Sequence, residues 1–434
     1  MSFEKGSKSV LNAWAFYDWA NSVYALVITS SIFPLFYGAL FRLAHKDGIE
    51  VGGEVIKSES IISYVTAVGF LIVAFISPIL SGIADYLGNK KFFLKLFCGI
   101  GSVSCMLLYF FSLEHAFLGL LTYMFALIGF WGSLVFYNSY LPDIALESQQ
   151  DKISAKGYSL GYIGSVILLL INLFMVLKYD IFGFENELAA MRVSFLLVGI
   201  WWLGFAQVAY RKLPDFSNKK KLIKSVVFSG FKELRKVWQQ LQTKHKLKKY
   251  LFAFFVYSMG VQTVMIAAAY FGEKEIDWGS DSKRTFGLIT TILLIQIIAV
   301  AGAVLTARAS KRFGNIPTLI GINVFWLVLC SAVYFVKTPN EFYIVAAFVG
   351  LVMGGIQSLS RSTYSKLLPQ TEDTTSYFSF YDVAEKIGIV IGMFMYGFVA
   401  DQTGRVQNAI LFLIVFFLIG IVILTFANRE KRTI

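Results

Sequence analysis

Long hydrophobic segments recur along the chain and alternate with short polar ones. Most are about 20 residues long, the length of helix that crosses roughly 30 Å of hydrocarbon. We interpret twelve of them as membrane spans, so the chain is predicted to be an all-α, polytopic membrane protein with twelve transmembrane helices. The predicted spans are residues 11–41, 61–83, 92–112, 116–138, 156–177, 192–210, 250–272, 285–307, 316–336, 342–364, 376–399 and 406–427.

Some boundaries between spans depend on single features. The first span is longer than the others and contains Pro34, so we expect it to be tilted or kinked. Short polar turns, at Glu114-His115 and at 337–341, separate two pairs of spans. Without such a turn, each pair would form one helix of over about 40 residues, which is too long to cross a bilayer once.

The composition excludes the main soluble classes. Of the 434 residues, 57% are hydrophobic and 15% are charged, whereas soluble domains are about 45–50% apolar and about 25% charged. A soluble enzyme, a disordered chain and a nucleic-acid-binding domain are therefore ruled out. The net charge of +12 does not indicate a nucleic-acid partner, because the excess lies in one loop between hydrophobic segments. That distribution is typical of contact with anionic lipid and of topology control.

Cysteine and histidine provide no sign of a disulfide, a metal site or a cofactor. The three cysteines lie in hydrophobic runs and the three histidines in predicted loops: Cys98, Cys105, Cys330, His45, His115 and His245. The polar N-terminus, residues 1–10, precedes a hydrophobic stretch that is too long for a cleaved signal peptide. We expect that stretch to remain as the first span.

Lys and Arg are distributed unevenly between the two sides of the predicted membrane protein. Most of the 39 fall on the side of the N-terminus, and a third of them lie in residues 211–249. By the positive-inside rule, both termini and this central loop are predicted to be cytoplasmic. We expect a multi-pass protein of the cell membrane, the inner membrane of a bacterium.

The central loop divides the chain into 1–210 and 250–434, with six spans each. Within 211–249, hydrophobic residues recur at helical spacing and basic residues occupy other faces, which predicts an amphipathic helix lying on the cytoplasmic leaflet. The alternative is a flexible basic tether. The hydrophobic positions are Ile223, Val227, Phe231, Leu234, Trp238 and Leu241.

A loop between the second and third spans carries a distinctive set of residues. In order, these are Ser81, Asp85, Gly88, Lys90 and Lys91. The loop resembles the signature loop of the major facilitator superfamily, small-x-x-x-Asp-Arg-x-Gly-Arg-Arg/Lys, although basic residues are missing at two of its positions. A small residue allows close helix approach, Gly88 supplies a tight turn, and the two lysines are expected to hold the loop at the cytoplasmic surface.

The resemblance implies a role for the acidic residue of this loop. Asp85 is expected to cap the positive end of the eleventh span, near Thr374 to Ser376. The alternative is a generic positive-inside turn. A second stretch of similar pattern, from Gly397 through Asp401 to Arg405, falls on the outer side, where we expect only a capped turn.

Further motifs narrow the resemblance to one branch of the superfamily. The first span carries Tyr-Asp-Trp-Ala-Asn at 17–21, and related motifs occur at 141–145, 354–362 and 397–404. Together they resemble the vacuolar amino-acid effluxer-like, autophagy-related branch. This implies a major facilitator fold, with two six-helix bundles around a central cavity, and a secondary carrier. Amino-acid efflux from vacuoles is known for fungal relatives.

Asp18 is the most informative residue of the first span, because a charged residue deep in a span costs about 2.5–3.5 kcal/mol. Tyr17 and Asn21 lie close enough in sequence to share a face with it. One interpretation is a site for a substrate amine or a proton. The other is a hydrogen-bonding cluster that packs helices together.

The eleventh span carries three charged residues. Asp382 and Lys386 are spaced i, i+4 and can pair, which leaves Glu385 as a surplus carboxylate and a candidate proton carrier. Arg361, near the end of the tenth span, is an alternative partner for Glu385. Two glutamines inside spans, Gln262 and Gln357, either line a polar cavity or join helices.

These observations predict a secondary active transporter that works by alternating access. The expected solute is small and polar, an amino acid or a related metabolite, and its movement is expected to be coupled to protons. We expect a monomer in the lipid bilayer that makes and breaks no covalent bond. A lipid-handling or scramblase-type protein is the alternative. A membrane-embedded enzyme is disfavoured, because the sequence has no Ser/His/Asp, zinc-binding or paired histidine pattern.

Overall fold

The computed structural model describes residues 4–51, 54–216 and 226–430. Within them, 12 helical segments are long and apolar enough to cross a membrane. Each agrees with one predicted span to within a few residues, except that Glu147–Leu177 starts nine residues earlier and Ala116–Ile144 and Lys283–Phe313 each end six residues later than predicted. The membrane-spanning part of the fold is therefore the predicted one.

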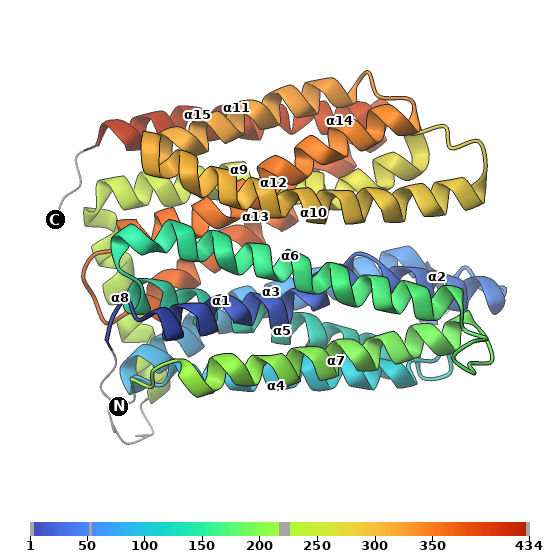
Figure 1. Ribbon diagram of the computed structural model, residues 1–434, viewed down its shortest axis with the longest axis horizontal. Coiled ribbons are helices and arrows are strands. Elements are labelled where there is room, and N and C mark those ends of the chain that lie inside the picture. Colours follow the sequence, from blue (N-terminus) through green and yellow to red (C-terminus); the bar gives the residue numbers. More distant parts are fainter. Residues whose placement is uncertain (1–3, 52–53, 217–225, 431–434) are drawn as a thin grey trace.

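The helices form two bundles of six spans, one above the other in Figure 1. The first bundle contains α1 (Lys8–Val23), a π-helical turn (Tyr24–Thr29), α2 (Ile32–Leu43), α3 (Ser58–Leu87), α4 (Lys90–Leu107), a 3₁₀ turn (Leu108–Phe110), α5 (Ala116–Ile144), α6 (Glu147–Leu177) and α7 (Glu187–Lys212). The second contains α9 (His245–Glu275), α10 (Asp281–Phe313), α11 (Asn315–Val333), α12 (Pro339–Leu367), α13 (Thr374–Thr403), α14 (Val406–Phe412) and α15 (Ile414–Arg429).

The first span is interrupted, as its proline predicts. The π-helical turn ends at Thr29, and α2 begins at Ile32, so that Pro34 lies in the first turn of α2. Proline has no N–H, and its ring clashes with the carbonyl four residues earlier, here that of Ser30. The break therefore precedes Pro34, where the helix cannot continue past this clash.

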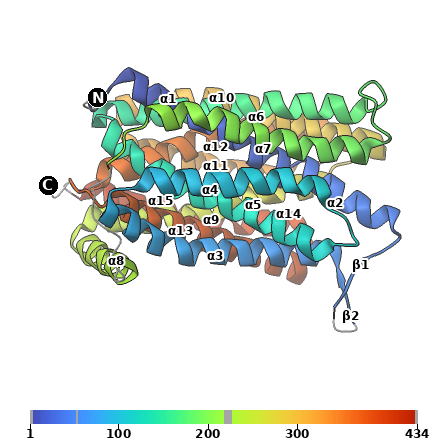
Figure 2. The same cartoon turned by 90° about the horizontal axis from the view of Figure 1, so that it is seen from below.

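A short hairpin connects the first two spans and was not predicted. Strand β1 (Gly48–Val51) pairs with β2 (Glu54–Lys57) in antiparallel register, with Gly48 opposite Lys57. The sequence between the strands is Gly52-Gly53, a pair typical of hairpin turns. The hairpin lies at the end of the molecule away from α8 (Figure 2).

Helix α8 (Val226–Thr243) lies at the end of the molecule where α1 begins and α15 ends (Figure 1). We call this end the α8 end. Residues 226–243 of the central loop thus form the helix that the sequence predicts. Its position on a lipid leaflet, and the predicted division at 211–249, stay predictions.

The packing of α8 differs from the predicted hydrophobic stripe. Leu241 and Val237 are buried, but Trp238 is 51% exposed, and Ile223 lies outside the described residues. The helix is held to α13 by polar contacts, because the Tyr377 hydroxyl donates to Gln240 Oε1 at 2.9 Å. Its buried face therefore packs on the protein itself.

Candidate functional site

A buried ion pair joins the two bundles inside the membrane-spanning region. Arg361 of α12 donates from Nη2 to Asp18 Oδ2 of α1 at 3.1 Å, and the two side chains are only 2% and 6% exposed. The Tyr137 hydroxyl donates to the same carboxylate oxygen at 2.9 Å. Asp18 is thus satisfied by a cation from the opposite bundle and a hydroxyl from its own.

The other contacts of Arg361 also come from the first bundle. Its Nε donates to Ser154 Oγ at 3.0 Å, its Nη2 to the Ser154 carbonyl at 3.0 Å, and its Nη1 to Asn138 Oδ1 at 3.2 Å. The guanidinium carbon lies 4.8 Å from the ring centre of Trp14 and 4.3 Å from that of Tyr158. Cation–π contacts of this kind are favourable within about 6 Å.

A glycine on α6 makes room for this ion pair. A Cβ added at Gly157 would lie 2.3 Å from Asp18 Oδ2 and 3.0 Å from Arg361 Nη2. Any larger residue would therefore displace one of the two charged groups. The absence of a side chain at position 157 allows α6 to approach both α1 and α12.

A second charged cluster lies on α13. Lys386 is buried and contacts both Asp382 and Glu385, with its Nζ 3.2 Å from Glu385 Oε2. Gln262 of α9 donates to Glu385 Oε1 at 2.9 Å. Across the bundle interface, Lys386 Nζ lies 3.8 Å from the ring centre of Trp131 on α5. One cation therefore serves two carboxylates at this position.

The contacts of this cluster identify the partner of Glu385, which the sequence left open. Asp382 and Lys386 form the predicted pair, but the alternative partner for Glu385 is wrong, because Arg361 binds Asp18 instead. The reason is geometric: Arg361 points across the interface into the first bundle, whereas Glu385 is bound by residues of its own bundle.

Of the remaining predicted polar residues, one lies at the interface between the bundles and two pack inside the first bundle. Gln357 of α12 accepts a hydrogen bond from the Tyr162 hydroxyl of α6 at 2.5 Å and so lies at the interface. Tyr17 is buried in the first bundle, with its ring centre 4.8 Å from that of Tyr137. Asn21 is also buried there and accepts from the Ser22 hydroxyl at 3.4 Å.

The signature loop makes the predicted contact with the start of α13. Asp85 Oδ1 accepts from the backbone N–H of Thr375 at 3.2 Å, and Oδ2 accepts from that of Ser376 at 2.6 Å. Gly88 ends α3 with a left-handed φ of 65°, which is the tight turn that this position requires. Ser81 is buried on α3. The expected cap is therefore confirmed as a contact.

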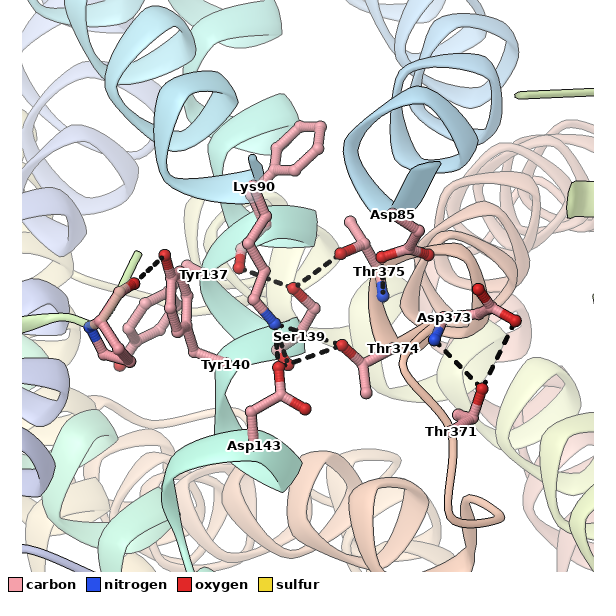
Figure 3. A network of polar contacts seen from close by, with 12 residues as sticks. Asp85, Lys90, Tyr137, Ser139, Tyr140, Asp143, Thr371, Asp373, Thr374 and Thr375 are labelled. Atoms are coloured by element: carbon pink, nitrogen blue, oxygen red, sulfur yellow. Dashed lines mark hydrogen bonds and ion pairs between the residues drawn. The ribbon is translucent and has the colours of Figure 1, made fainter. Parts of the chain in front are cut away.

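The expectation for the two lysines of this loop is wrong for Lys90. It is 5% exposed, contacts Asp143, and donates to the Ser139 carbonyl at 3.1 Å and to Thr374 Oγ1 at 3.2 Å (Figure 3). A buried ammonium needs a paired anion. The Lys90 side chain therefore points inward to Asp143 rather than to the surface.

Lys91, its neighbour, donates from Nζ to the Leu213 carbonyl at 2.8 Å. It therefore links the loop to the chain that follows α7. The second stretch of similar pattern, from Gly397 to Arg405, is a capped turn as expected, because α13 ends at Thr403 and Gly404 has a φ of 65°.

A further polar contact between the bundles was not predicted. Asp151, near the start of α6, accepts from Ser310 Oγ at 3.1 Å and from Asn315 Nδ2 at 2.9 Å. It also accepts from Lys366 Nζ at 2.5 Å. Three donors of the second bundle thus hold one carboxylate of the first.

The polar contacts between the bundles share a location. The Asp85 cap, the Asp151 contacts and the Asp18–Arg361 pair lie between the middle of the molecule and its α8 end. A further bond, from Ser154 Oγ to the Ser358 carbonyl at 2.7 Å, belongs to the same region. In this structure these polar contacts therefore join the bundles at the α8 end, and Ile292, Leu293 and Met393 of the second bundle pack against the hydrophobic core of the first nearer the other end.

Two six-span bundles with a capping loop between the second and third spans define a transporter of the major facilitator superfamily. A model of the family described as "Vacuole effluxer Atg22 like" matches residues 6–433. The chain belongs to this family.

Individual relatives agree with this assignment. The MFS-type transporter YxiO of Bacillus subtilis is 33% identical over 424 residues, which cover 97% of this chain and 95% of YxiO. Autophagy-related protein 22 of Eremothecium gossypii is 24% identical over 478 residues, which cover 96% and 90% of the two chains.

Solved structures show the same fold at low sequence identity. The fucose:proton symporter FucP of E. coli has a TM-score of 0.68 at 16% identity and covers 97% of this chain and 98% of its own. The proton:xylose symporter XylE has a TM-score of 0.68 at 14% identity, with coverages of 96% and 94%. The family match and the relatives thus make this protein a multi-pass membrane transporter of the major facilitator type, and the solved structures agree in fold.

Proposed function

We propose that this transporter is a secondary active carrier for a small polar solute, an amino acid or a related metabolite, and that it works by alternating access coupled to protons. The observation that carries the proposal is the buried Asp18–Arg361 pair. Charged groups inside a membrane are costly and mark solute or proton pathways. This pair also joins two bundles that must separate during transport.

We further propose that the α8 end is cytoplasmic and that the protein resides in the cell membrane as a monomer. The excess of Lys and Arg on the side of the N-terminus supports this orientation. Because the bundles are joined at the α8 end, we take this conformation to be the one closed toward the cytoplasm. The carrier makes no covalent change to its solute.

For the coupled proton we propose the α13 cluster. Asp18 is the first choice on sequence grounds, but its charge is balanced by Arg361. At Lys386, one cation faces two carboxylates, Asp382 and Glu385. The surplus negative charge is most easily removed by a proton. Glu385 is the more accessible of the two, at 18% exposure against 6% for Asp382.

Solute flux into proteoliposomes, measured with and without an imposed pH gradient, tests this proposal. The wild-type protein is expected to accumulate solute only with the gradient. Glu385→Gln should lose accumulation but retain downhill exchange, whereas Asp18→Asn should impair both. If both variants accumulate solute as the wild type does, neither residue carries the proton. If no soluble solute shows saturable uptake, the lipid-handling alternative replaces the transporter for polar solutes.

A further inference from the structure

A tryptophan of the first bundle is the third partner of the buried Lys386. The ammonium nitrogen of Lys386 lies 3.8 Å from the ring centre of Trp131 on α5, while Asp382 and Glu385 contact the same nitrogen from α13. A cation over the face of an indole ring is attracted by its negative quadrupole, most strongly where water is excluded. Because the Lys386 side chain is only 1% exposed, water weakens this contact little.

The Trp131 ring is held by other aromatic rings of its own bundle. Its ring centre lies 5.6 Å from that of Phe70 on α3 and 5.2 Å from that of Phe130 on α5. Trp131 therefore moves with the first bundle, whereas Lys386 and its two carboxylates move with the second.

The contact between Lys386 and Trp131 lies in the half of the interface that parts when the bundles open at the α8 end. Lys386 comes 12 residues after Thr374, the first residue of α13, so it is about 18 Å along a helix of about 45 Å. Trp131 comes 13 residues before Ile144, the last residue of α5, so it is about 20 Å from that end. Opening at the α8 end therefore draws the ring away from the ammonium.

The charge of the two carboxylates changes the strength of this contact. When Asp382 and Glu385 are both ionised, one ammonium faces two negative groups, and the cluster as a whole is negative. Their surplus charge opposes the attraction between Lys386 and the negative face of the ring. A proton on either carboxylate makes the cluster neutral and removes this opposition. The contact between the bundles is therefore stronger when the cluster is protonated.

We propose that Trp131 is a positioning residue that couples protonation of the α13 cluster to docking of the two bundles. This inference rests on the proposed function, in which the same cluster carries the coupled proton. Coupling between two equilibria is reciprocal. A cluster that holds the ring more tightly when protonated also holds the proton more tightly while the bundles are joined at the α8 end. Parting of the bundles withdraws the ring and favours release of the proton.

Other ionisable groups near α13 differ from the cluster in type or in position. Three tyrosines, one each from α6, α9 and α13, interact electrostatically with Glu385 and stay neutral at physiological pH: Tyr158, Tyr257 and Tyr381. Charged side chains of α3, α4, α5 and α8 contact the start of α13, about 18 Å from Lys386 along the helix: Asp85, Lys90, Asp143 and Lys236. These groups are the same in every variant of Trp131, so a comparison of those variants isolates the ring.

The test measures how pH changes the distance between the bundles at the α8 end of the purified full-length protein. Spin labels are attached at Lys212→Cys, at the end of α7, and at Lys311→Cys, in the last turn of α10. Both positions are exposed, and the native cysteines are buried. The pH response is the ratio of joined to parted conformations at acid pH, divided by the same ratio at alkaline pH.

Trp131→Leu should lower this pH response about 5- to 30-fold relative to the wild type, the effect of a cation–π contact from which water is excluded. Trp131→Phe, which keeps a smaller ring, should lie between the two. In the Glu385→Gln background, Trp131→Leu should no longer change the response. The matched control is Phe136→Leu on the same helix, because this ring stacks on Phe93 within the first bundle. It should respond as the wild type does.

A graded series alters the charge distribution of the ring and keeps its shape. Trp131 is replaced by tryptophans with increasing numbers of fluorine atoms, which withdraw electrons and weaken the negative potential on the ring face. The pH response should fall step by step along the series. An unchanged response throughout the series would overturn the inference, whether or not Trp131→Leu folds. A wild-type response in a folded Trp131→Leu protein would overturn it as well.

This inference and the proposed function can fail separately. If Glu385→Gln loses accumulation in a pH gradient but the fluorinated series responds as the wild type does, the cluster carries the proton and Trp131 does not couple it. If the fluorinated series loses its pH response but Glu385→Gln accumulates solute as the wild type does, the ring senses the charge of the cluster and the proposed proton carrier is wrong.

Discussion

The carboxylate of Asp85 in the first bundle accepts the backbone N–H of Ser376 in the second at 2.6 Å. Ser376 lies in the first turn of α13, where backbone N–H groups have no partner within the helix. An anion at this position also interacts favourably with the positive end of the helix dipole. Asp85 therefore stabilises the conformation in which the bundles are joined at the α8 end.

The first prediction concerns this cap. Asp85→Asn keeps the shape and removes the charge, so the joined conformation should lose about 1–2 kcal/mol, a factor of roughly 5–30 in its population. Solute flux should be slowed more than expression is lowered. The matched control is Asp401→Asn, in the stretch of similar pattern at the other end of α13, which should transport as wild type does. If the Asp85→Asn variant transports solute as the wild type does, the loop is only a turn and has no role in transport.

A second prediction concerns Asp151, a carboxylate of the first bundle that, unlike Asp85, accepts hydrogen bonds from side chains of the second. Its donors Ser310 and Asn315 lie in the last turn of α10 and at the start of α11. Asp151→Asn should favour the conformation open at the α8 end, as Asp85→Asn does. The double variant should then open further than either single one. The reactivity of a cysteine introduced at Ser358, measured in detergent with a thiol reagent, reports this opening. If the reactivity increases in none of the variants, Asp85 and Asp151 do not hold the bundles together at the α8 end.

The sequence predicts local features of this molecule well. Span positions follow from hydrophobic runs, and Asp382 and Lys386 pair because they are one helical turn apart. The Asp85 contact was predictable only through the family motif, since its partner Ser376 lies in the other bundle. In each of these cases the signal is contained in neighbouring residues or in a known pattern.

Contacts made by docking of the two bundles were not predictable. Asp18 and Arg361 are 343 positions apart, and no spacing rule connects residues on helices of different bundles. The inward direction of Lys90 depends in the same way on where α5 places Asp143. Asp151 gave no signal, because acidic residues are ordinary in the first turns of a helix. These partners are fixed by tertiary packing.

The third prediction concerns Gly157. Gly157→Ala adds a Cβ that would lie 2.3 Å from Asp18 Oδ2, so the ion pair must shift, and overpacking of this kind costs about 1–3 kcal/mol. Gly204→Ala on α7 is the control, because nothing lies within 4 Å of its added Cβ. There the better helix propensity should stabilise by up to about 1 kcal/mol. Thermal unfolding of both variants checks the difference, and equal melting temperatures would contradict the tight approach of α6.

The last prediction concerns the orientation of the protein in the membrane. If the α8 end is cytoplasmic, a cysteine at the exposed position Arg235 of α8 is shielded from a membrane-impermeant thiol reagent in intact cells and reacts after permeabilisation. A cysteine at the exposed position Glu185, between α6 and α7 at the opposite end, should react without permeabilisation. Background labelling should be low, because Cys98, Cys105 and Cys330 are buried. If Arg235→Cys is labelled efficiently in intact cells and Glu185→Cys is protected, the topology is the reverse of the one proposed. The proposed direction of closure toward the cytoplasm would then be inverted with it.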